Sequence, residues 1–355
     1  MLARSSASMI EALAVVAPGR PLRQGLDRIV QADRGALIVV GDGPEVLNIC
    51  SGGFLLDAEF SPQRISELAK MDGAIILAAD ASRIARANVH LVPSPNVPTS
   101  ETGTRHRTAE RVARSVDVPV ISVSEALSII AVYREGMKHQ LELVPRLVAR
   151  ANQAVQTLER YKNRLDAVSG SLTALEAEDL VTMRNVMVVL QRAEMVRRIA
   201  EEIEGYIVEL GTDGRLVRLQ LEELMAGVED DRRLVIRDYF HDRRSWRMDQ
   251  AVESLSNLST EAILDPKEVM GVFHLPARPD AIESAVQPRG YRLLSKIPGV
   301  SPALVERIVD HFGSLQKILR ASLADFDAVE GVGAVRARAV KDGITRLVET
   351  SILER

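Results

Sequence analysis

Short runs of aliphatic residues alternate with amphipathic stretches along the first 139 residues. Runs of four to six residues that are mainly β-branched or aliphatic predict strands, and apolar positions spaced three and four residues apart predict helices. The expected strands are Ala36–Val40, Val46–Cys50, Ala74–Ala78, Val89–Val92 and Val118–Val123, and the expected helices are Met9–Val16, Leu22–Ala32, Ser61–Met71 and Ala109–Val116. The alternation predicts an α/β domain of mixed α+β type over residues 1–139.

The pattern changes after Gln140, because apolar residues at helical spacing then alternate with Arg and Glu for long stretches. The expected helices are Leu141–Val168, Ala177–Leu210 and Leu216–Phe240, with breaks at Ser169–Ser171 and Gly211–Gly214. This composition predicts an all-α spacer over residues 140–287. Pro276, Pro279 and Pro288 mark a linker into a last domain, residues 288–355.

The last domain contains an internal repeat. Ile297–Val300 precedes a helical stretch, Pro302–Phe312, and Val329–Gly333 precedes a second one, Ala334–Leu347. A glycine turn at a helix N-terminus points free backbone N–H groups and the positive end of the helix dipole at one spot, which suits a phosphate. The repeat therefore predicts an all-α domain with two phosphate-binding turns; alternatively, the glycines serve only as helix caps.

Arg289–Leu347 resembles a tandem helix-hairpin-helix DNA-binding domain, because both hairpins occur at that family's spacing. The resemblance implies that three glycines lie at the duplex backbone and that three basic side chains contact phosphates. These residues are Gly299, Gly331 and Gly333, and Lys296, Arg336 and Arg338. Contacts to the phosphate backbone carry no sequence information, so base readout is not expected.

Composition and charge narrow the function classes. Hydrophobic residues make up 46% and charged residues 26% of the chain, which is typical of a globular protein. Residues 1–139 contain 15 basic residues (Lys and Arg) and 15 acidic ones (Asp and Glu), and residues 140–287 contain 19 basic and 26 acidic ones. Residues 288–355 contain 11 basic and 8 acidic ones. Nucleic acid is therefore expected to bind at the last domain, which is basic. No membrane-spanning run and no secretory signal is evident, so a cytoplasmic location is expected, and the hairpins are compatible with nucleoid association.

Two clusters in the first domain carry candidate chemistry. Asp72-Gly73-Ala74 precedes an aliphatic run and offers a carboxylate for a divalent metal, although an Asp-Gly pair is often only a turn. Gly103–Thr108, with the sequence Gly-Thr-Arg-His-Arg-Thr, leads into a helix. Two arginines at a helix start oppose the helix dipole, which favours a bound anion, although a solvated basic helix start is the alternative. Neither a Walker loop nor a Gly-x-Gly-x-x-Gly fingerprint is present.

These two motifs, the helical middle and the tandem hairpins together resemble the family of DNA-integrity scanning diadenylate cyclases, over essentially the whole chain and in that family's domain order. The resemblance implies condensation of two ATP molecules into cyclic di-3′,5′-AMP, with release of two pyrophosphates and with Mg²⁺ or Mn²⁺ as cofactor. Two facing protomers would supply the two nucleotides, in a homo-oligomer expected to be an octamer. Branched or damaged DNA at the hairpins would regulate the activity.

The resemblance also implies roles for single residues. Asp72 would hold the metal and assist deprotonation of the ribose 3′-hydroxyl, and Arg105, His106 and Arg107 would complete the catalytic set. The ATP-binding set would be Asp72, Gly73, Ala74, Leu91, Gly103, Thr104, Arg105, His106, Arg107, Thr108 and Ser124. Glu125 is a weaker candidate for the metal, because Ser124 and Glu125 could equally begin a helix.

Two other function classes stay open from the residues alone. One is a DNA-binding scaffold with a nucleotide sensor as first domain, which the acidic Asp72 disfavours because a sensor needs no metal-binding carboxylate. The other is an accessory to a repair nuclease or ligase, which is weakened by the absence of a second acidic cluster.

Overall fold

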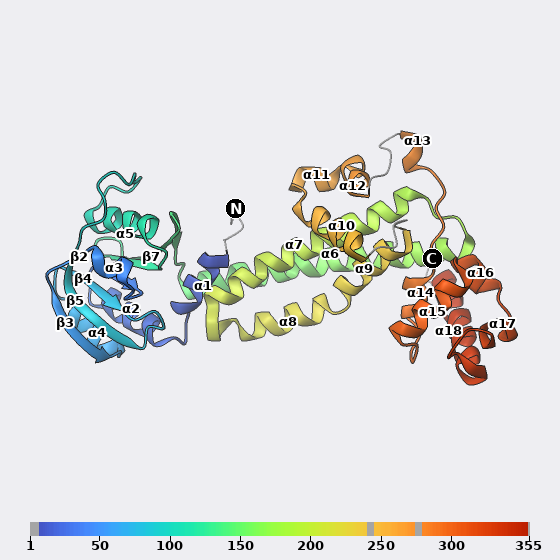
Figure 1. Cartoon of the computed structure of the whole chain (residues 1–355), viewed down its shortest axis with the longest axis horizontal. Coiled ribbons are helices and arrows are strands. Elements are labelled where there is room, and N and C mark those ends of the chain that lie inside the picture. Colours follow the sequence, from blue (N-terminus) through green and yellow to red (C-terminus); the bar gives the residue numbers. More distant parts are fainter. Residues whose placement is uncertain (1–6, 240–244, 274–278, 354–355) are drawn as a thin grey trace. The chain divides into compact units, whose positions relative to one another are not determined.

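The computed structural model describes residues 7–239, 245–273 and 279–353. The chain forms two compact units, Met1–Val155 with Glu201–Gln220, and Gln156–Ala200 with Leu221–Arg355. The prediction of a mixed α/β N-terminal domain followed by helical middle and C-terminal regions is confirmed (Figure 1). None of the helices in the described ranges is both long and apolar enough to cross a membrane.

A mixed sheet forms the centre of the N-terminal domain. Its strands follow the order β2-β5-β4-β1-β6-β7-β8, and β3 pairs with β5. Of these pairs, β1 with β4 is parallel and the others are antiparallel. The strands are β1 (Ala36–Val40), β2 (Cys50–Ser51), β3 (Phe54–Glu59), β4 (Ala74–Leu77), β5 (Arg83–Leu91), β6 (Val120–Ser124), β7 (Ile129–Arg134) and β8 (Met137–Gln140).

Helices cover both faces of this sheet (Figure 1). Helices α1 (Ala7–Val15), α2 (Pro21–Gln31) and α4 (Pro62–Leu68) pack on one face, and α3 (Pro44–Asn48) and α5 (Thr104–Ser115) on the other. Strand β1 alternates between the two cores: Ile38 lies among the first group and Val39 among the second. Burial on both faces explains why this strand is a continuous aliphatic run.

Local caps explain several boundaries. Ser61 caps α4, since its side chain accepts a hydrogen bond from the backbone N–H of Arg64 at 3.2 Å. The strand expected at Val46–Cys50 is wrong, because Pro44 begins helix α3 there and only Cys50 continues into β2. The hairpin of β7 and β8 was not expected; it turns at Glu135 and Gly136, which both have positive φ.

The helical middle region departs from the expected breaks. Helix α6 (Val144–Glu178) continues through Ser169–Ser171, so the break predicted there is wrong. The chain instead turns at Asp179 (φ 60°), and α7 (Met183–Leu210) follows. The expected break at Gly211–Gly214 is confirmed as a 3₁₀ turn.

The helix expected at Leu216–Phe240 is two helices, α8 (Arg215–Met225) and α9 (Val228–Tyr239), because Gly227 has φ 76° between them. Phe240 and Pro276 lie outside the described residues. Three further helices follow: α10 (Ser245–Asn257), α11 (Thr260–Leu264) and α12 (Pro266–Val272).

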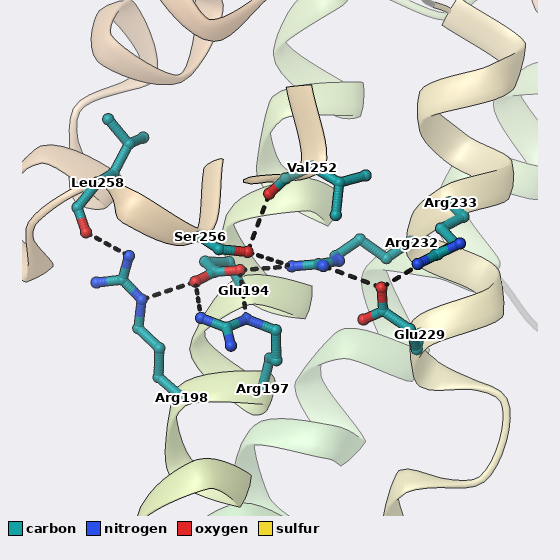
Figure 2. Close-up of polar contacts among 9 residues, drawn as sticks. All are labelled: Glu194, Arg197, Arg198, Glu229, Arg232, Arg233, Val252, Ser256 and Leu258. Carbon is teal, nitrogen blue, oxygen red and sulfur yellow. Dashed lines mark hydrogen bonds and ion pairs between the residues drawn. The ribbon is translucent and has the colours of Figure 1, made fainter. Parts of the chain in front are cut away.

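A buried ion cluster centres on Glu194 of α7 (Figure 2). The Glu194 carboxylate accepts two hydrogen bonds from Arg197, at 2.9 and 2.7 Å, one from Arg198 at 2.8 Å and one from Arg232 of α9 at 2.7 Å. Arg198 also donates to the carbonyl of Leu258, at 2.5 Å. Burial opposes ionisation, yet the hydrogen bonds from Arg197 and Arg198 lower the pKa of Glu194. One carboxylate therefore joins α7, α9 and the end of α10.

The C-terminal region is a small helical domain with its own apolar core. Its helices are α13 (Pro279–Ile282), α14 (Tyr291–Ser295), α15 (Pro302–Phe312), α16 (Leu315–Arg320), α17 (Leu323–Asp327) and α18 (Gly333–Leu353). Ile297 and Val329, the first residues of the two expected hairpins, are both buried in that core. The apolar positions of the repeat thus fix the hairpins to the domain.

Candidate functional site

One edge of the sheet gathers the residues of the two N-terminal motifs. Ile38 pairs with Ile75, Ala36 with Val123 and Ala74 with Val89, so β1 and β4 begin where β5 and β6 end. Asp72 and Gly73 precede β4 at this edge. Leu91 ends β5, and Ser124 ends β6. The register therefore brings together segments that are about 20 to 50 residues apart in the chain.

Arg105 connects the two motifs at this edge. Its Nη2 lies 3.2 Å from Oδ1 of Asp72, and its Nη1 lies 3.9 Å from Oε2 of Glu125. The side chains of Asp72 and Glu125 are 97% and 65% exposed, so both carboxylates keep most of their surface for a ligand. Exposed pairs of this kind contribute little stability. The guanidinium and the carboxylates are thus free to exchange partners.

Gly35 makes room for this guanidinium. A Cβ atom at residue 35 would lie 2.2 Å from Nη1 of Arg105. Gly35 carries no signal in the sequence, because only the fold brings it beside the motif. A larger side chain here would displace Arg105.

Helix α5 begins inside the second motif. Gly103 is its N-cap, the backbone N–H of Arg107 donates to the Gly103 carbonyl at 2.8 Å, and the first turn contains no acidic residue. The first backbone N–H groups of a helix have no intrahelical acceptor. Thr104 and Arg107 are exposed at this end, whereas the Thr108 hydroxyl donates back to the Thr104 carbonyl at 3.0 Å. The arrangement suits an anion such as a polyphosphate.

His106 faces the sheet instead of the exposed end of α5. Its Nδ1 lies 2.9 Å from the Tyr133 hydroxyl and 2.8 Å from the Ser122 hydroxyl. Burial lowers the pKa of His106. The structure therefore separates His106 from its neighbours Arg105 and Arg107, which the sequence motif groups together.

The remaining candidates of the nucleotide set differ in exposure. Ala74 and Leu91 are buried in the core and present little surface at the edge. Gly73 is required by the sheet itself, since a Cβ there would lie 2.4 Å from the backbone carbonyl carbon of Asn88. Ser124 is half-buried and pairs with Ile129. Among the residues that the structure describes, no three His, Cys, Asp or Glu side chains gather as a metal site.

The two C-terminal hairpins have the same backbone geometry. Val300 N–H donates to the Ile297 carbonyl at 3.2 Å, and Val332 N–H donates to the Val329 carbonyl at 3.0 Å. The third residue of each turn is a glycine, Gly299 with φ 83° and Gly331 with φ 79°. These φ values match the third residue of a type II turn, where a side chain would be strained.

Basic side chains flank both hairpins. Lys296 is exposed before the first one, and Arg336 and Arg338 are exposed at the start of α18, which begins at Gly333 (φ 56°). Arg336 Nη1 donates to the Gly331 carbonyl at 2.9 Å. Arg307 of α15 was missed from the sequence: a Cβ at Gly331 would lie 2.3 Å from its Nη1. The second hairpin therefore has two guanidinium groups beside it.

Three family models match successive parts of the chain. Residues 23–138 match the model described as DisA bacterial checkpoint controller nucleotide-binding, and residues 141–281 match the DisA bacterial checkpoint controller linker region. Residues 291–346 match the SAM-like helix-hairpin-helix tandem. The sheet-edge site falls within the first match and both hairpins fall within the third.

Relatives described as DNA integrity scanning protein DisA are similar to the chain along nearly its whole length. The protein of Frankia alni is 56% identical, covering 97% of this chain and 96% of its own. The protein of Streptomyces avermitilis is 53% identical, covering 98% and 94%. The protein of Kineococcus radiotolerans is 54% identical, covering 97% and 96%.

Proposed function

The chain belongs to the DisA family of DNA integrity scanning proteins, and on that premise we propose that its sheet-edge site condenses two ATP molecules into cyclic di-3′,5′-AMP. The observation that carries this proposal is the position of Arg105, between the carboxylates of Asp72 and Glu125 and within the first turn of α5. A nucleotidyl transferase needs a carboxylate and a group of hydrogen-bond donors that bind the negatively charged phosphates. Both lie at this edge of the sheet.

The reaction determines what each group has to do. The ribose 3′-hydroxyl of one ATP attacks the α-phosphorus of the other, in line with the departing pyrophosphate, and negative charge grows on the phosphate oxygens. Arg105, Arg107, Thr104 and the free amides at the start of α5 would bind the triphosphate and offset that charge. Asp72 is exposed at the same edge and would accept the proton of the 3′-hydroxyl.

A divalent cation fits the donor set of this edge. Asp72 and Glu125 offer two exposed carboxylates, and Mg²⁺ in phosphate-transfer sites is commonly held by one or two carboxylates together with substrate phosphates. Mn²⁺ also accepts such oxygen ligands. When bound, the ion would acidify the attacking hydroxyl and neutralise phosphate charge.

The product requires a second copy of the site. One edge presents one ATP, whereas the cyclic product contains two equivalent nucleotides, so two protomers would face each other across a twofold axis. Exposed apolar side chains next to the site support such a contact: Met71 precedes Asp72, Val92 follows Leu91, and Leu127 lies two residues after Glu125. An octamer built from such pairs remains part of the proposal.

The hairpins would bind the phosphates of DNA, and branched DNA there would change the rate of synthesis. A buried network supports this coupling. Arg292 of α14, just before the first hairpin, donates to Glu176 of α6 at 2.5 Å and to Thr173 at 2.9 Å. Asp238 of α9 accepts hydrogen bonds from the backbone N–H groups of Gly290 and Tyr291, both at 2.7 Å. The hairpin is therefore fastened to the helical region.

The test is to incubate the full chain and an Asp72→Asn variant with ATP and Mg²⁺ or Mn²⁺. The nucleotides are then separated by chromatography and identified by mass spectrometry. Cyclic di-AMP from the wild-type chain alone supports the proposal. ATP binding without product under either metal would favour a nucleotide sensor on a DNA-binding scaffold. Adding branched DNA then tests the coupling, which fails if saturating DNA leaves the rate unchanged.

A further inference from the structure

The histidine of the Gly103–Thr108 motif contacts two hydroxyl groups that the proposed chemistry does not use. We propose that His106 acts through its Nδ1 as a positioning residue, and that Tyr133 and Ser122 hold the start of α5 in place through it. This inference rests on the proposed function of the sheet-edge site. It assigns a role to two buried residues, Ser122 and Tyr133, that lie outside the proposed ATP-binding and DNA-binding sets.

The position of His106 on α5 fits an anchor. Residues three, four and seven positions later on a helix share its face. Ala109, Glu110 and Ala113 occupy those positions and are all buried; the two alanines pack in the core with the strands, and Glu110 accepts hydrogen bonds from Thr99 and Ser100 in the loop before α5. Arg105 and Arg107 are each one residue away, which turns their side chains about 100° around the helix from His106. Holding the imidazole therefore fixes the rotation of α5, and with it the directions of both arginines.

Both partners of His106 are rigidly placed. Ser122 lies on β6 and Tyr133 on β7, which pair directly, and neither side chain is exposed. Their oxygens lie 2.8 and 2.9 Å from the same nitrogen, Nδ1. Two hydroxyls from neighbouring strands thus meet one helix residue. Buried polar groups that satisfy one another in this way specify a single arrangement.

Tyr133 also contacts the loop that precedes α5. The Tyr133 hydroxyl donates to Oε1 of Glu101 at 3.2 Å, and Glu101 also pairs with Lys138 at 2.6 Å. The charged carboxylate is the stronger acceptor for the Tyr133 hydrogen, so the tyrosine oxygen presents a lone pair toward Nδ1. Glu101 precedes the N-cap Gly103 by two residues. Tyr133 therefore holds the first turn of α5 from both sides, through the helix and through the loop.

Two substitutions at residue 106 distinguish this role from direct phosphate binding. The amide of asparagine lies near the position of Nδ1, whereas the longer glutamine reaches the position of Nε2. The probe is 3′-deoxy-ATP with Mg²⁺, because it lacks the attacking hydroxyl and its Kd can be measured by calorimetry without turnover. We expect His106→Asn to bind the analogue about tenfold more tightly than His106→Gln, the value of one retained hydrogen bond. Equal affinities or the reverse order would overturn the proposal.

Tyr133→Phe provides a second measurement that does not alter the motif. It removes one oxygen and keeps the buried ring, and we expect a Kd for 3′-deoxy-ATP about tenfold weaker than that of the wild type. The matched control is Tyr206→Phe, which removes a buried hydroxyl that donates to Glu202 at 2.6 Å within α7 and should leave the Kd unchanged. An unchanged Kd in Tyr133→Phe would refute the anchor.

These affinities also separate this inference from the proposed function. A wild-type chain that binds 3′-deoxy-ATP but makes no cyclic product from ATP would refute the synthetic activity alone, because the ranking of the variants by Kd would still report the anchor. Thermal unfolding of each variant identifies any change in Kd that comes from loss of the fold.

Discussion

The Asp72 site and the Glu194 cluster both pair arginine with carboxylate, but they differ in how completely the charges are satisfied. Glu194 is fully buried and accepts four hydrogen bonds from three guanidinium groups (Figure 2). Asp72 is almost fully exposed and has one contact, at 3.2 Å, with Arg105. The first carboxylate has no capacity left for a ligand, and the second has nearly all of it.

This difference indicates that the Glu194 cluster contributes to folding stability and that the Asp72 site is available for chemistry. A buried charge is retained only if its partners replace the lost hydration, so removing one partner leaves an uncompensated charge. An exposed pair is already hydrated and costs little to separate. Substitution at the Glu194 cluster should therefore change folding, whereas substitution at the sheet edge should change chemistry.

Glu194→Gln gives the largest expected effect. The neutral amide leaves Arg197, Arg198 and Arg232 crowded together without their shared carboxylate, so the free energy of unfolding should fall by about 3–5 kcal/mol. Urea titration followed by circular dichroism measures it, with Asp72→Asn as the exposed control. A loss no larger than in the control would refute the contrast between the two sites.

The same substitution should remove an acid sensitivity. Because the pKa of Glu194 is lowered in the folded chain, its stabilisation is present above the ordinary value of 4.5 and is lost as the pH falls through the lowered value. The stability difference between the wild type and Glu194→Gln should therefore be large at neutral pH and shrink in acid. A constant difference across this range would contradict the assignment.

Asp72→Asn should have the next largest effect, on catalysis alone. The amide cannot accept the proton of the 3′-hydroxyl, so the rate of cyclic di-AMP formation should fall by about 100-fold or more. Its midpoint of thermal unfolding should match that of the wild type, because the side chain is 97% exposed. A comparable loss of affinity for 3′-deoxy-ATP would count against a catalytic role and indicate a binding role.

Arg107→Ala should have a smaller effect, on binding. Arg107 is exposed at the start of α5, so its loss should weaken binding of 3′-deoxy-ATP by about tenfold, the value of a charge-assisted hydrogen bond. Calorimetry on Arg107→Ala and Asp72→Asn side by side checks the division of roles. Equal losses of affinity in the two variants would contradict it.

Sequence patterns predicted the fold well where the contacts are local. Strand β1 has the expected bounds because burial on both faces demands an unbroken aliphatic run. The break expected at Ser169–Ser171 is wrong because Ser169 has a distant partner: Ser169, together with Thr173 one turn later, accepts a hydrogen bond from Arg292, more than a hundred residues away. A five-residue segment such as Val46–Cys50, with four apolar residues around Asn48, is too short to distinguish a strand from a helix by periodicity.

The residues of the candidate site were likewise predicted only where a local sequence motif contains them. The two motifs name Asp72 and Arg105, and the structure places their side chains in contact. Gly35, Ser122 and Tyr133 could not be found in this way, because only the register of the sheet brings them to α5. The inward direction of His106 did have a local sign, the apolar Ala109 and Ala113 at helical spacing. This sign was not used, because the motif groups His106 with the anion-binding residues Arg105 and Arg107.

The smallest expected effect comes from Gly299→Ala at the first hairpin. A Cβ there meets nothing within 4 Å, so the cost is the strain of a positive φ alone, about 1 kcal/mol. If DNA binding requires this turn, the Kd for branched DNA should rise about fivefold. Gly227→Ala is the matched control, since Gly227 has φ 76° and equally open surroundings but lies between α8 and α9. The same change in Kd for both variants would mean that the hairpin contributes only to the fold, and that its phosphate contacts lie elsewhere.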